Sequence, residues 1–277
     1  MQKTPLIAIL ITCFNRRETT LSCLASIESA ISGSADYKVV IVDDGSSDGT
    51  ADAVRAAYPD AVVAIGSGNL YWNGGMRMAW QNALQLHADF YLWLNDDTIL
   101  RPGAIRDMLS KYDQENFAKT IVVGCTVDPE TKQTTYGGYR RSTGLSRLRL
   151  RRLWSNEQYC DTMNGNCVLF PKTTTDDIGI NSHKFTHAFG DNDYGLRAIR
   201  AGYRIVELKD AVAEQTHNAE FVKSTSTLTY ANWRKILLHP KGVPVVEWWA
   251  FCREHGGPIW PVNFFWRYIK MLRLRAG

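Results

Sequence analysis

Two apolar stretches of the chain end in the same way, and this shared ending constrains the fold more than any other feature. The first is VVIVDD (39–44) and the second is FYLWLNDD (90–97). Neither run alternates apolar with polar residues, which is typical of strands buried on both faces of a parallel sheet. The carboxyl ends of neighbouring parallel strands meet at one edge, where ligands of such sheets bind. Because bare carboxylates do not gather without cations or hydrogen-bond donors, the acids predict a ligand site.

The order of the polar residues after the second strand assigns them different roles. Side chains alternate along an extended chain, so Asn95 and Asp97 are expected on one side and Asp96 on the other. The spacing of Asn95 and Asp97 could hold one divalent cation and its ligand. An alternative stays open for the first strand, because acids are common where turns begin and one of Asp43 and Asp44 could only cap its turn.

Hydrophobic periodicity predicts an α/β fold with a mostly parallel sheet. In the first hundred residues, strands are expected at 6–13, 37–44, 61–65 and 90–94, and helices at 16–31, 48–58 and 75–87. Later strands are expected at 120–125, 166–170, 203–208 and 211–217, and helices at 191–203 and 228–239. The Arg-rich stretch 131–156 is expected to form a long loop or a hairpin. From Lys241 the composition changes, so we predict a main domain at 1–240 and a tail at 241–277.

Composition excludes several classes of protein. The 277 residues, 45% of them hydrophobic, fit one sizeable domain with an appendage. The six cysteines form no C-x-x-C pair and no zinc spacing, and no apolar run approaches the length of a membrane span. The simplest interpretation is therefore a cytoplasmic setting. The chain also lacks a nucleic-acid-binding motif, a G-x-G-x-x-G fingerprint and a P-loop, which disfavours a nucleotide-dependent oxidoreductase.

Six segments in a fixed order carry a family resemblance. They are ITCFNR (11–16), VIVDDGSSDGT (40–50), GNLYWNGGMR (68–77), WLNDDT (93–98), GDNDYGLRAIRAGYR (190–204) and the isolated His217. Each is weak alone, but together they resemble glycosyltransferase family 2, an inverting family of GT-A fold, over about residues 5–235. The resemblance implies a Rossmann-like mixed sheet flanked by helices.

The resemblance also implies roles for individual residues. The donor-binding candidates are Thr12, Asn15, Arg16, Asp43, Asp44, Asn69, Gly75, Arg77, Asn95 and Asp96. Asp97 and His217 are the implied ligands of a divalent cation, Mn²⁺ or Mg²⁺. Asp191 takes the position of the general base, although Gly190 replaces the Glu that usually precedes it. Arg77 also departs from the family, whose members often carry Asn there.

Several of these residues have structural alternatives. Asp193 is expected to pair with Arg197 at i+4 on a helix rather than to take part in chemistry. His217 is as readily a satisfied polar residue as a ligand, and His183 and His187 are expected to pack in a loop rather than to touch an acceptor. Trp72 could stack on a sugar or fill the core, and the sequence does not separate the two.

Basic residues are concentrated in two segments. Residues 131–156 hold seven Lys and Arg and no acid, and residues 261–275 (PVNFFWRYIKMLRLR) mix aromatic and aliphatic residues with four more. The second segment starts at a proline suited to the first helical turn. Two interpretations stay open: an interfacial helix on the inner face of an anionic membrane, or a helix docked on the core or in a homodimer interface.

The expected function is transfer of a sugar from a nucleotide-diphosphate donor to a saccharide or lipid-linked saccharide acceptor, in synthesis of a surface polysaccharide such as an O-antigen or capsule. The Asn-Asp-Asp and Gly-Gly forms resemble the rhamnosyltransferase-like branch, which favours a dTDP- or UDP-linked sugar. The alternative is a catalytically silent nucleotide-sugar-binding protein, because Gly190 and Asn95 depart from the usual motifs.

Overall fold

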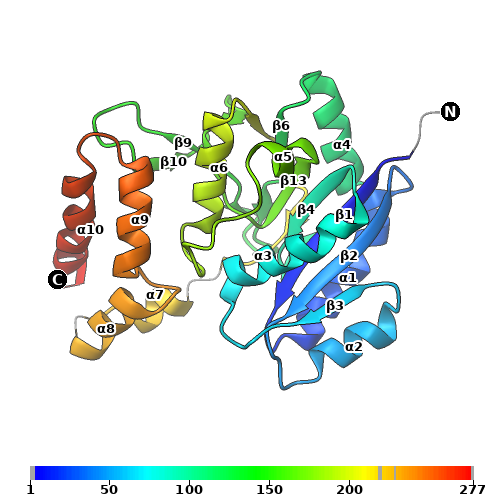
Figure 1. Cartoon of the computed structure of the whole chain (residues 1–277), viewed down its shortest axis with the longest axis horizontal. Coiled ribbons are helices and arrows are strands. Elements are labelled where there is room, and N and C mark those ends of the chain that lie inside the picture. The colour runs from blue at the N-terminus through cyan, green and yellow to red at the C-terminus, as the bar shows by residue number, and fades with distance from the viewer. Residues whose placement is uncertain (1–3, 218–219, 228, 276–277) are drawn as a thin grey trace.

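The computed structural model describes residues 4–217, 220–227 and 229–275 (Figure 1). Its main element is an eight-stranded mixed sheet with the order β11-β14-β6-β13-β4-β1-β2-β3. These strands are β1 (Leu6–Cys13), β2 (Asp36–Asp43), β3 (Val62–Ile65), β4 (Phe90–Leu94), β6 (Thr120–Val123), β11 (Tyr159–Cys160), β13 (Cys167–Pro171) and β14 (Arg204–Glu207). Strands β1 to β4 run parallel, as predicted, whereas β13 runs antiparallel to both β4 and β6. This is the α/β GT-A type of sheet that the sequence predicted.

Helices cover both faces of this sheet (Figure 1). One face packs against α1 (Arg17–Ile31), α2 (Thr50–Ala57) and α4 (Ala104–Glu115), and the other against α3 (Tyr71–Ala83) and α6 (Gly190–Arg200). Strand β1 shows why its sequence is apolar throughout: Ile7 and Ile9 enter the first cluster, and Ala8 and Leu10 the second. All four side chains are buried. A strand that packs on both faces needs no polar alternation.

Helix α3 begins at Tyr71, four residues before the predicted start at Gly75. The Asp44 carboxylate accepts hydrogen bonds from the backbone N–H groups of Leu70 and Tyr71, at 2.8 and 3.0 Å. It therefore satisfies donors that a helix N-terminus leaves open. Because this cap comes from the end of β2, local sequence patterns around residue 71 do not reveal it.

The Arg-rich stretch forms a hairpin, which decides between the two predicted forms. Strands β9 (Gly138–Arg141) and β10 (Leu150–Arg152) pair antiparallel, and β12 (Thr162–Met163) completes their sheet. Arg151 pairs with Glu157 at 2.7 Å, and Arg152 with Glu207 at 3.1 Å. Much of the predicted basic segment is therefore neutralised within the fold. The other short elements are β5 (Ile99–Leu100), β7 (Thr126–Val127), β8 (Thr134–Tyr136), β15 (Ala213–Glu214), a 3₁₀ turn (Leu84–Leu86), α5 (Thr173–Asp177) and α7 (Glu220–Ser224).

The predicted tail is packed on the rest of the protein. It contains α10 (Trp260–Arg275), as predicted, and α9 (Val245–His255), which was not predicted. Together with α8 (Tyr230–Leu238), these helices share a third hydrophobic cluster with α6, made of Phe185, Leu196, Ile236, Val243, Trp248, Phe251, Cys252 and Phe264. The helix predicted at 228–239 starts at Tyr230, and Leu228 lies outside the described residues. Within the described part of the chain, no helix has the length and hydropathy needed to cross a bilayer.

Candidate active site

A cleft of about 580 Å³ opens where β1, β2 and β4 end. Seven of the thirteen predicted site residues line it: Thr12, Arg16, Asp44, Asn95, Asp96, Asp97 and Asp191. The lining also includes Tyr71, Trp72, Tyr136, Asn164, Gly165, Asn166, His187, Gln215, Phe221, His239 and Lys241. The strand-end acids and the expected base therefore share one cleft, although about a hundred residues separate them in the chain.

The two acids after β4 both bind Arg16. Its guanidinium donates to Asp96 Oδ1 at 3.2 Å and to Asp97 Oδ2 at 2.9 Å. The prediction that Asp96 points away from Asp97 was wrong, because β4 ends at Leu94 and the residues that follow form a turn. Strict side-chain alternation holds only within a strand. Asp96 is therefore part of the same charged group as Asp97.

This group has the chemistry that a divalent cation needs. Two adjacent carboxylates already hold one cationic side chain at this point, and carboxylate oxygens are the ligands that Mg²⁺ and Mn²⁺ prefer. Burial raises the pKa of Asp96 to about 7, despite the opposing effect of Arg16. A further positive charge would therefore favour the ionised form of this carboxyl group. The residues present fit the predicted metal.

Gln215 holds Asp97 in place, and the sequence did not reveal this role. Its Nε2 donates to Asp97 Oδ1 at 2.5 Å, and its Oε1 accepts from Thr98 at 2.8 Å and from Asn166 at 2.9 Å. The side chain is buried, so its polar groups depend on these partners. Gln215 follows the end of β15 and acts on a residue 118 positions away, so no local pattern revealed it.

His217 lies beside the cleft rather than in its lining. The ring stacks on that of Tyr136, with centroids 5.4 Å apart and an interplanar angle of 8°. Tyr136 itself lines the cleft. The structure therefore places His217 next to a residue of the cleft lining. Its role as a metal ligand stays a prediction.

The acids after β2 organise loops around the cleft. Asp43 Oδ1 accepts from the Ser46 backbone at 2.7 Å, which is the predicted turn cap, whereas its buried Oδ2 has no hydrogen-bond partner within the described part of the chain. Asp44 accepts from Gly68 as well as from the start of α3, so both of its oxygens are engaged. Asn15 accepts from the Ser47 backbone at 2.8 Å and ties the end of β1 to the turn after β2. Asp43, which is buried, and Asn15, which is exposed, are thus not part of the cleft lining.

Besides Asp43 and Asn15, three more predicted donor-binding residues lie outside the lining, among the residues described. Asn69 is exposed in the loop before α3. Gly75 packs α3 against β1, because a Cβ there would lie 2.0 Å from Thr12 Oγ1. Arg77 donates to the carbonyl of Ser182 at 3.3 Å and so binds a loop. Their donor-binding roles stay predictions, and the visible role of Gly75 and Arg77 is packing.

Asp191 enters the cleft from the first turn of α6. Its Oδ1 accepts from the Asn192 backbone at 2.7 Å, and its Oδ2 accepts from the Gly165 backbone at 3.2 Å. Burial raises the pKa of Asp191 above the ordinary value for Asp, although these hydrogen bonds oppose the rise. A carboxylate with a raised pKa is a stronger proton acceptor than an ordinary Asp, which suits a general base.

The glycine before Asp191 has a packing reason. A Cβ at Gly190 would lie 2.2 Å from Asn73 Oδ1, so the usual Glu does not fit here. Asn73 is fully buried, and its Nδ2 donates to the carbonyls of Ser182 and Phe185 at 2.8 and 2.6 Å. Asn73 on α3 thereby anchors the loop that leads into α6. The departure at Gly190 therefore leaves the space that Asn73 fills.

Trp72 connects the two sides of the cleft. Its Nε1 donates to Asn95 Oδ1 at 2.7 Å, and its ring covers Gly165, where a Cβ would lie 2.3 Å from the indole. Gly165 in turn donates to Asp191. The indole also meets Trp93 edge to face, with centroids 5.4 Å apart. Trp72 thus packs on the core and lines the cleft, and its stacking on a sugar stays a prediction.

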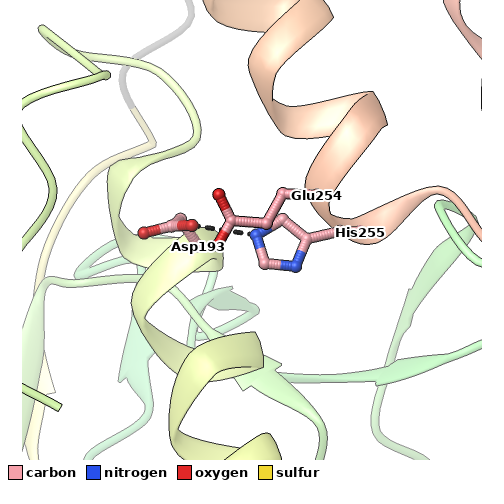
Figure 2. A group of neighbouring side chains, drawn as sticks. All are labelled: Asp193, Glu254 and His255. Atoms are coloured by element: carbon pink, nitrogen blue, oxygen red, sulfur yellow. Dashed lines mark hydrogen bonds and ion pairs between the residues drawn. The ribbon is translucent and has the colours of Figure 1, made fainter.

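A buried ion-pair cluster fixes α6 to the tail (Figure 2). Asp193 on α6 accepts from Arg197 at 2.9 Å, the predicted i+4 pair, and contacts His255 Nε2 on α9 at 2.8 Å. Glu254 lies beside them and pairs with Lys184 at 2.9 Å and with Arg200. Burial lowers the pKa of His255, although Asp193 opposes the decrease. Asp193, Glu254 and His255 could together hold a metal ion by spacing, but Lys and Arg already balance both acids.

Comparison with known proteins decides the family. The model of the family described as "Glycosyltransferase like family 2" matches residues 4–229, well over half of the chain. The chain belongs to glycosyltransferase family 2. This glycosyltransferase shares its fold with mannosyltransferase PcManGT from Pyrobaculum calidifontis, solved with GDP-Man and Mn²⁺ (TM-score 0.58, 16% identity, 94% of this chain and 68% of that one).

A second solved relative in fold is TarS of S. aureus. Its residues 1–349 in complex with UDP align with a TM-score of 0.56 and 13% identity, over 89% of this chain and 70% of that one. No curated protein matches the sequence. At these identities the two structures establish the GT-A-like fold of this glycosyltransferase and no finer property.

Proposed function

We propose that this family 2 glycosyltransferase transfers a sugar from a nucleoside-diphosphate donor to a hydroxyl group of a saccharide or lipid-linked saccharide, with inversion and with a divalent cation. One observation carries the proposal: Asp191 and the Asp96–Asp97 pair line the same cleft, linked through Gly165, Trp72 and Asn95. A base and a cation site on one sugar-sized cleft are what such a transfer needs.

In this mechanism each side of the cleft has one task. Asp97, held by Gln215, and Asp96 would hold the cation, which would supply charge stabilisation to the diphosphate leaving group. Asp191 accepts the proton of the acceptor hydroxyl as the hydroxyl oxygen attacks the anomeric carbon. The Gly165 N–H and Asn192 orient the carboxylate. Attack from the side opposite the leaving group inverts the anomeric configuration.

The donor class is proposed from the family and from its solved neighbours in fold. PcManGT was solved with GDP-Man and Mn²⁺, and TarS with UDP, which supports a nucleotide donor here. We propose a dTDP- or UDP-linked sugar, with rhamnose as the first sugar to test, and a role in assembling a surface polysaccharide such as an O-antigen or capsule. The unpartnered Oδ2 of Asp43 supports a base or ribose contact behind the cleft.

A screen of nucleotide sugars tests this function. The protein is mixed with dTDP-, UDP- and GDP-sugars, with and without Mn²⁺ or Mg²⁺, and both its thermal midpoint and the released nucleoside diphosphate are measured. We expect at least one donor to raise the midpoint only with metal and to release diphosphate. Stabilisation without any hydrolysis or transfer would favour a silent nucleotide-sugar-binding protein, and no response to any nucleotide would overturn the proposal.

A further inference from the structure

Helix α10 carries an apolar stripe on the side that faces away from the core. The α10 outer face consists of Val262, Phe265, Trp266, Ile269 and Leu272, with exposed fractions of 61, 62, 52, 41 and 45%. These residues follow one another at spacings of three, one, three and three, which places them on one side of a helix. The opposite side packs inward, where Phe264 is only 8% exposed. Within the described residues, the helix is therefore apolar on both sides, and the inner side packs on the third hydrophobic cluster while the outer side is exposed.

Neighbouring helices extend this exposed apolar surface. Val246 and Trp249 on α9 are 79 and 43% exposed, and Leu238 at the end of α8 is 64% exposed. The rings of Trp249 and Trp260 meet edge to face with centroids 4.6 Å apart, which joins α9 to the start of α10. In Figure 1, α8, α9 and α10 lie together at the end of the molecule farthest from α2. Several large apolar side chains on one end are unusual for a surface that meets only water.

The charge of this end is strongly positive. Residues 228–277 contain eight Lys and Arg against two Glu, whereas the other 227 residues contain 24 Lys and Arg against 26 Asp and Glu. Neither acid adds an unpaired negative charge to the surface, because Glu247 is buried and Glu254 pairs with Lys184 and Arg200. Exposed bases include Arg234, Lys235, Lys241, Arg253 and Lys270. The surface that α8 to α10 offer to a partner is thus apolar and basic.

These properties favour an anionic bilayer over a second copy of the chain. A two-fold interface would bring like-charged flanks together, which is unfavourable. Anionic lipid headgroups supply the opposite charge, and the interfacial region accepts apolar side chains along a helix that lies in its plane. The same end borders the cleft, since Leu238 is followed by His239 and Lys241, which line it. A bilayer beneath α10 would therefore lie close to the mouth of the cleft.

We propose that the α10 outer face, with the exposed apolar residues of α8 and α9, docks this protein on an anionic membrane surface as a peripheral contact. Docking requires neither a donor nor transfer, so it stands or falls separately from the proposed function. If both hold, a lipid-linked acceptor would meet the cleft at the membrane surface.

Flotation of the full chain with lipid vesicles tests the proposal. The vesicles contain either phosphatidylcholine alone or phosphatidylcholine with about 30% phosphatidylglycerol. We expect the protein to float with the anionic vesicles at low salt, to float at least about tenfold less with the neutral ones, and to be released as salt rises. Equal binding to both vesicles, or none to either, would overturn the proposal.

Matched variants assign the contact to α10. Phe265→Ser with Ile269→Ser is expected to reduce flotation at least about tenfold, because two exposed side chains would no longer enter the interface. Leu84→Ser with Phe117→Ser, which removes two exposed apolar residues outside the tail, is the control and is expected to float like the wild type. Undiminished flotation of the α10 variant at an unchanged thermal midpoint would refute the assignment.

Sedimentation without vesicles tests the alternative that a second copy of the chain covers this surface. We expect both the wild type and the α10 variant to sediment as monomers. A wild-type dimer that the α10 variant breaks would identify this surface as a subunit interface and overturn the membrane proposal. If the α10 variant unfolds, Lys270→Glu with Lys235→Glu provides the second test, with reduced flotation expected on anionic vesicles only.

Discussion

The two sides of the cleft hold their functional groups by different means. On the strand side, Arg16, Asn95 and Asp97 follow directly from buried strands, so the sheet itself brings them together. On the α6 side, Asp191 depends on contacts between segments far apart in the chain: Asn73 anchors the preceding loop, and His255 on α9 binds Asp193. The strand side is thus built mainly from residues that follow buried strands, with Gln215 as a distant support, whereas the α6 side depends on contacts between distant segments.

The largest effect is expected from Asp191→Asn on the α6 side. The substitution keeps the shape of the side chain but removes the proton acceptor, so transfer should fall about 10³-fold. Donor affinity should stay nearly unchanged, because the cation site belongs to the strand side. Product formation and donor titration are the measurements. Near-normal transfer would remove Asp191 from the role of base.

The pH profile of the wild type sharpens this assignment. Asp191 must be ionised to accept a proton, and burial raises its pKa above the ordinary value for Asp. The transfer rate should therefore decline with falling pH at a higher pH than an ordinary Asp would cause. Asp161→Asn, which changes an acid outside the cleft lining, is the control. It should leave the pH dependence of the transfer rate unchanged. A rate that stays constant down to pH 4 would contradict this prediction.

The next effect is expected on the strand side, from Asp97→Asn. Losing one carboxylate from the pair should weaken metal-dependent donor binding about 100-fold, because a cation at a diphosphate contributes several kcal/mol of charge stabilisation. Chelation of the metal should weaken donor binding by the wild type to a similar extent. It should weaken donor binding by the variant only slightly further. Calorimetric titration of the donor with and without Mn²⁺ measures both. Equal affinity of variant and wild type with Mn²⁺ would show that the cation site lies elsewhere.

A smaller effect is expected where the tail holds α6. Asp193→Asn removes the charge that pairs with Arg197 and faces His255 and should lower the free energy of unfolding by about 2 kcal/mol. The loss stays below that of breaking a whole buried pair, because Arg197 also donates to two backbone carbonyls. Glu254→Gln, on the half-exposed rim of the same cluster, should cost at most about 1 kcal/mol. Equal losses in chemical denaturation would mean that burial does not distinguish the two acids.

The same contrast explains how much the sequence could predict. Strands β1, β2 and β4 and the acids that follow them were predictable, because a buried strand and its polar end occupy one short segment. The start of α3 was not, since Asp44 caps it from another strand. Gln215 and Asn73 were missed for the same reason, because each acts on residues more than a hundred positions away. Patterns of local periodicity carry no information about such partners.

Asp96 shows a second limit of prediction. Alternation placed it away from Asp97, but the chain leaves the strand one residue before Asn95, and the turn brings both carboxylates to Arg16. Where a strand ends is the least certain part of a sequence-based prediction. The identity of the functional segment was therefore predictable, whereas the direction of each side chain within it was not.

The last effect is expected only at acidic pH and concerns His187, which lies on the α6 side at the cleft wall. Burial, with Lys241 and His239 nearby, lowers the pKa of His187 to about 4 from an ordinary value near 6.5, and its Nδ1 has no hydrogen-bond partner among the described residues. The fold therefore favours the neutral ring, so this contribution to stability is present above pH 6.5 and is lost as the pH falls towards 4. His187→Asn removes the titrating group while leaving the neighbouring lysine in place. As the pH falls from 6.5 to 4, the wild type should therefore lose stability relative to the variant. Denaturation curves across this range measure it, and a difference that does not vary with pH would show that the ring is open to solvent and that the α6 side is less tightly packed than the strand side.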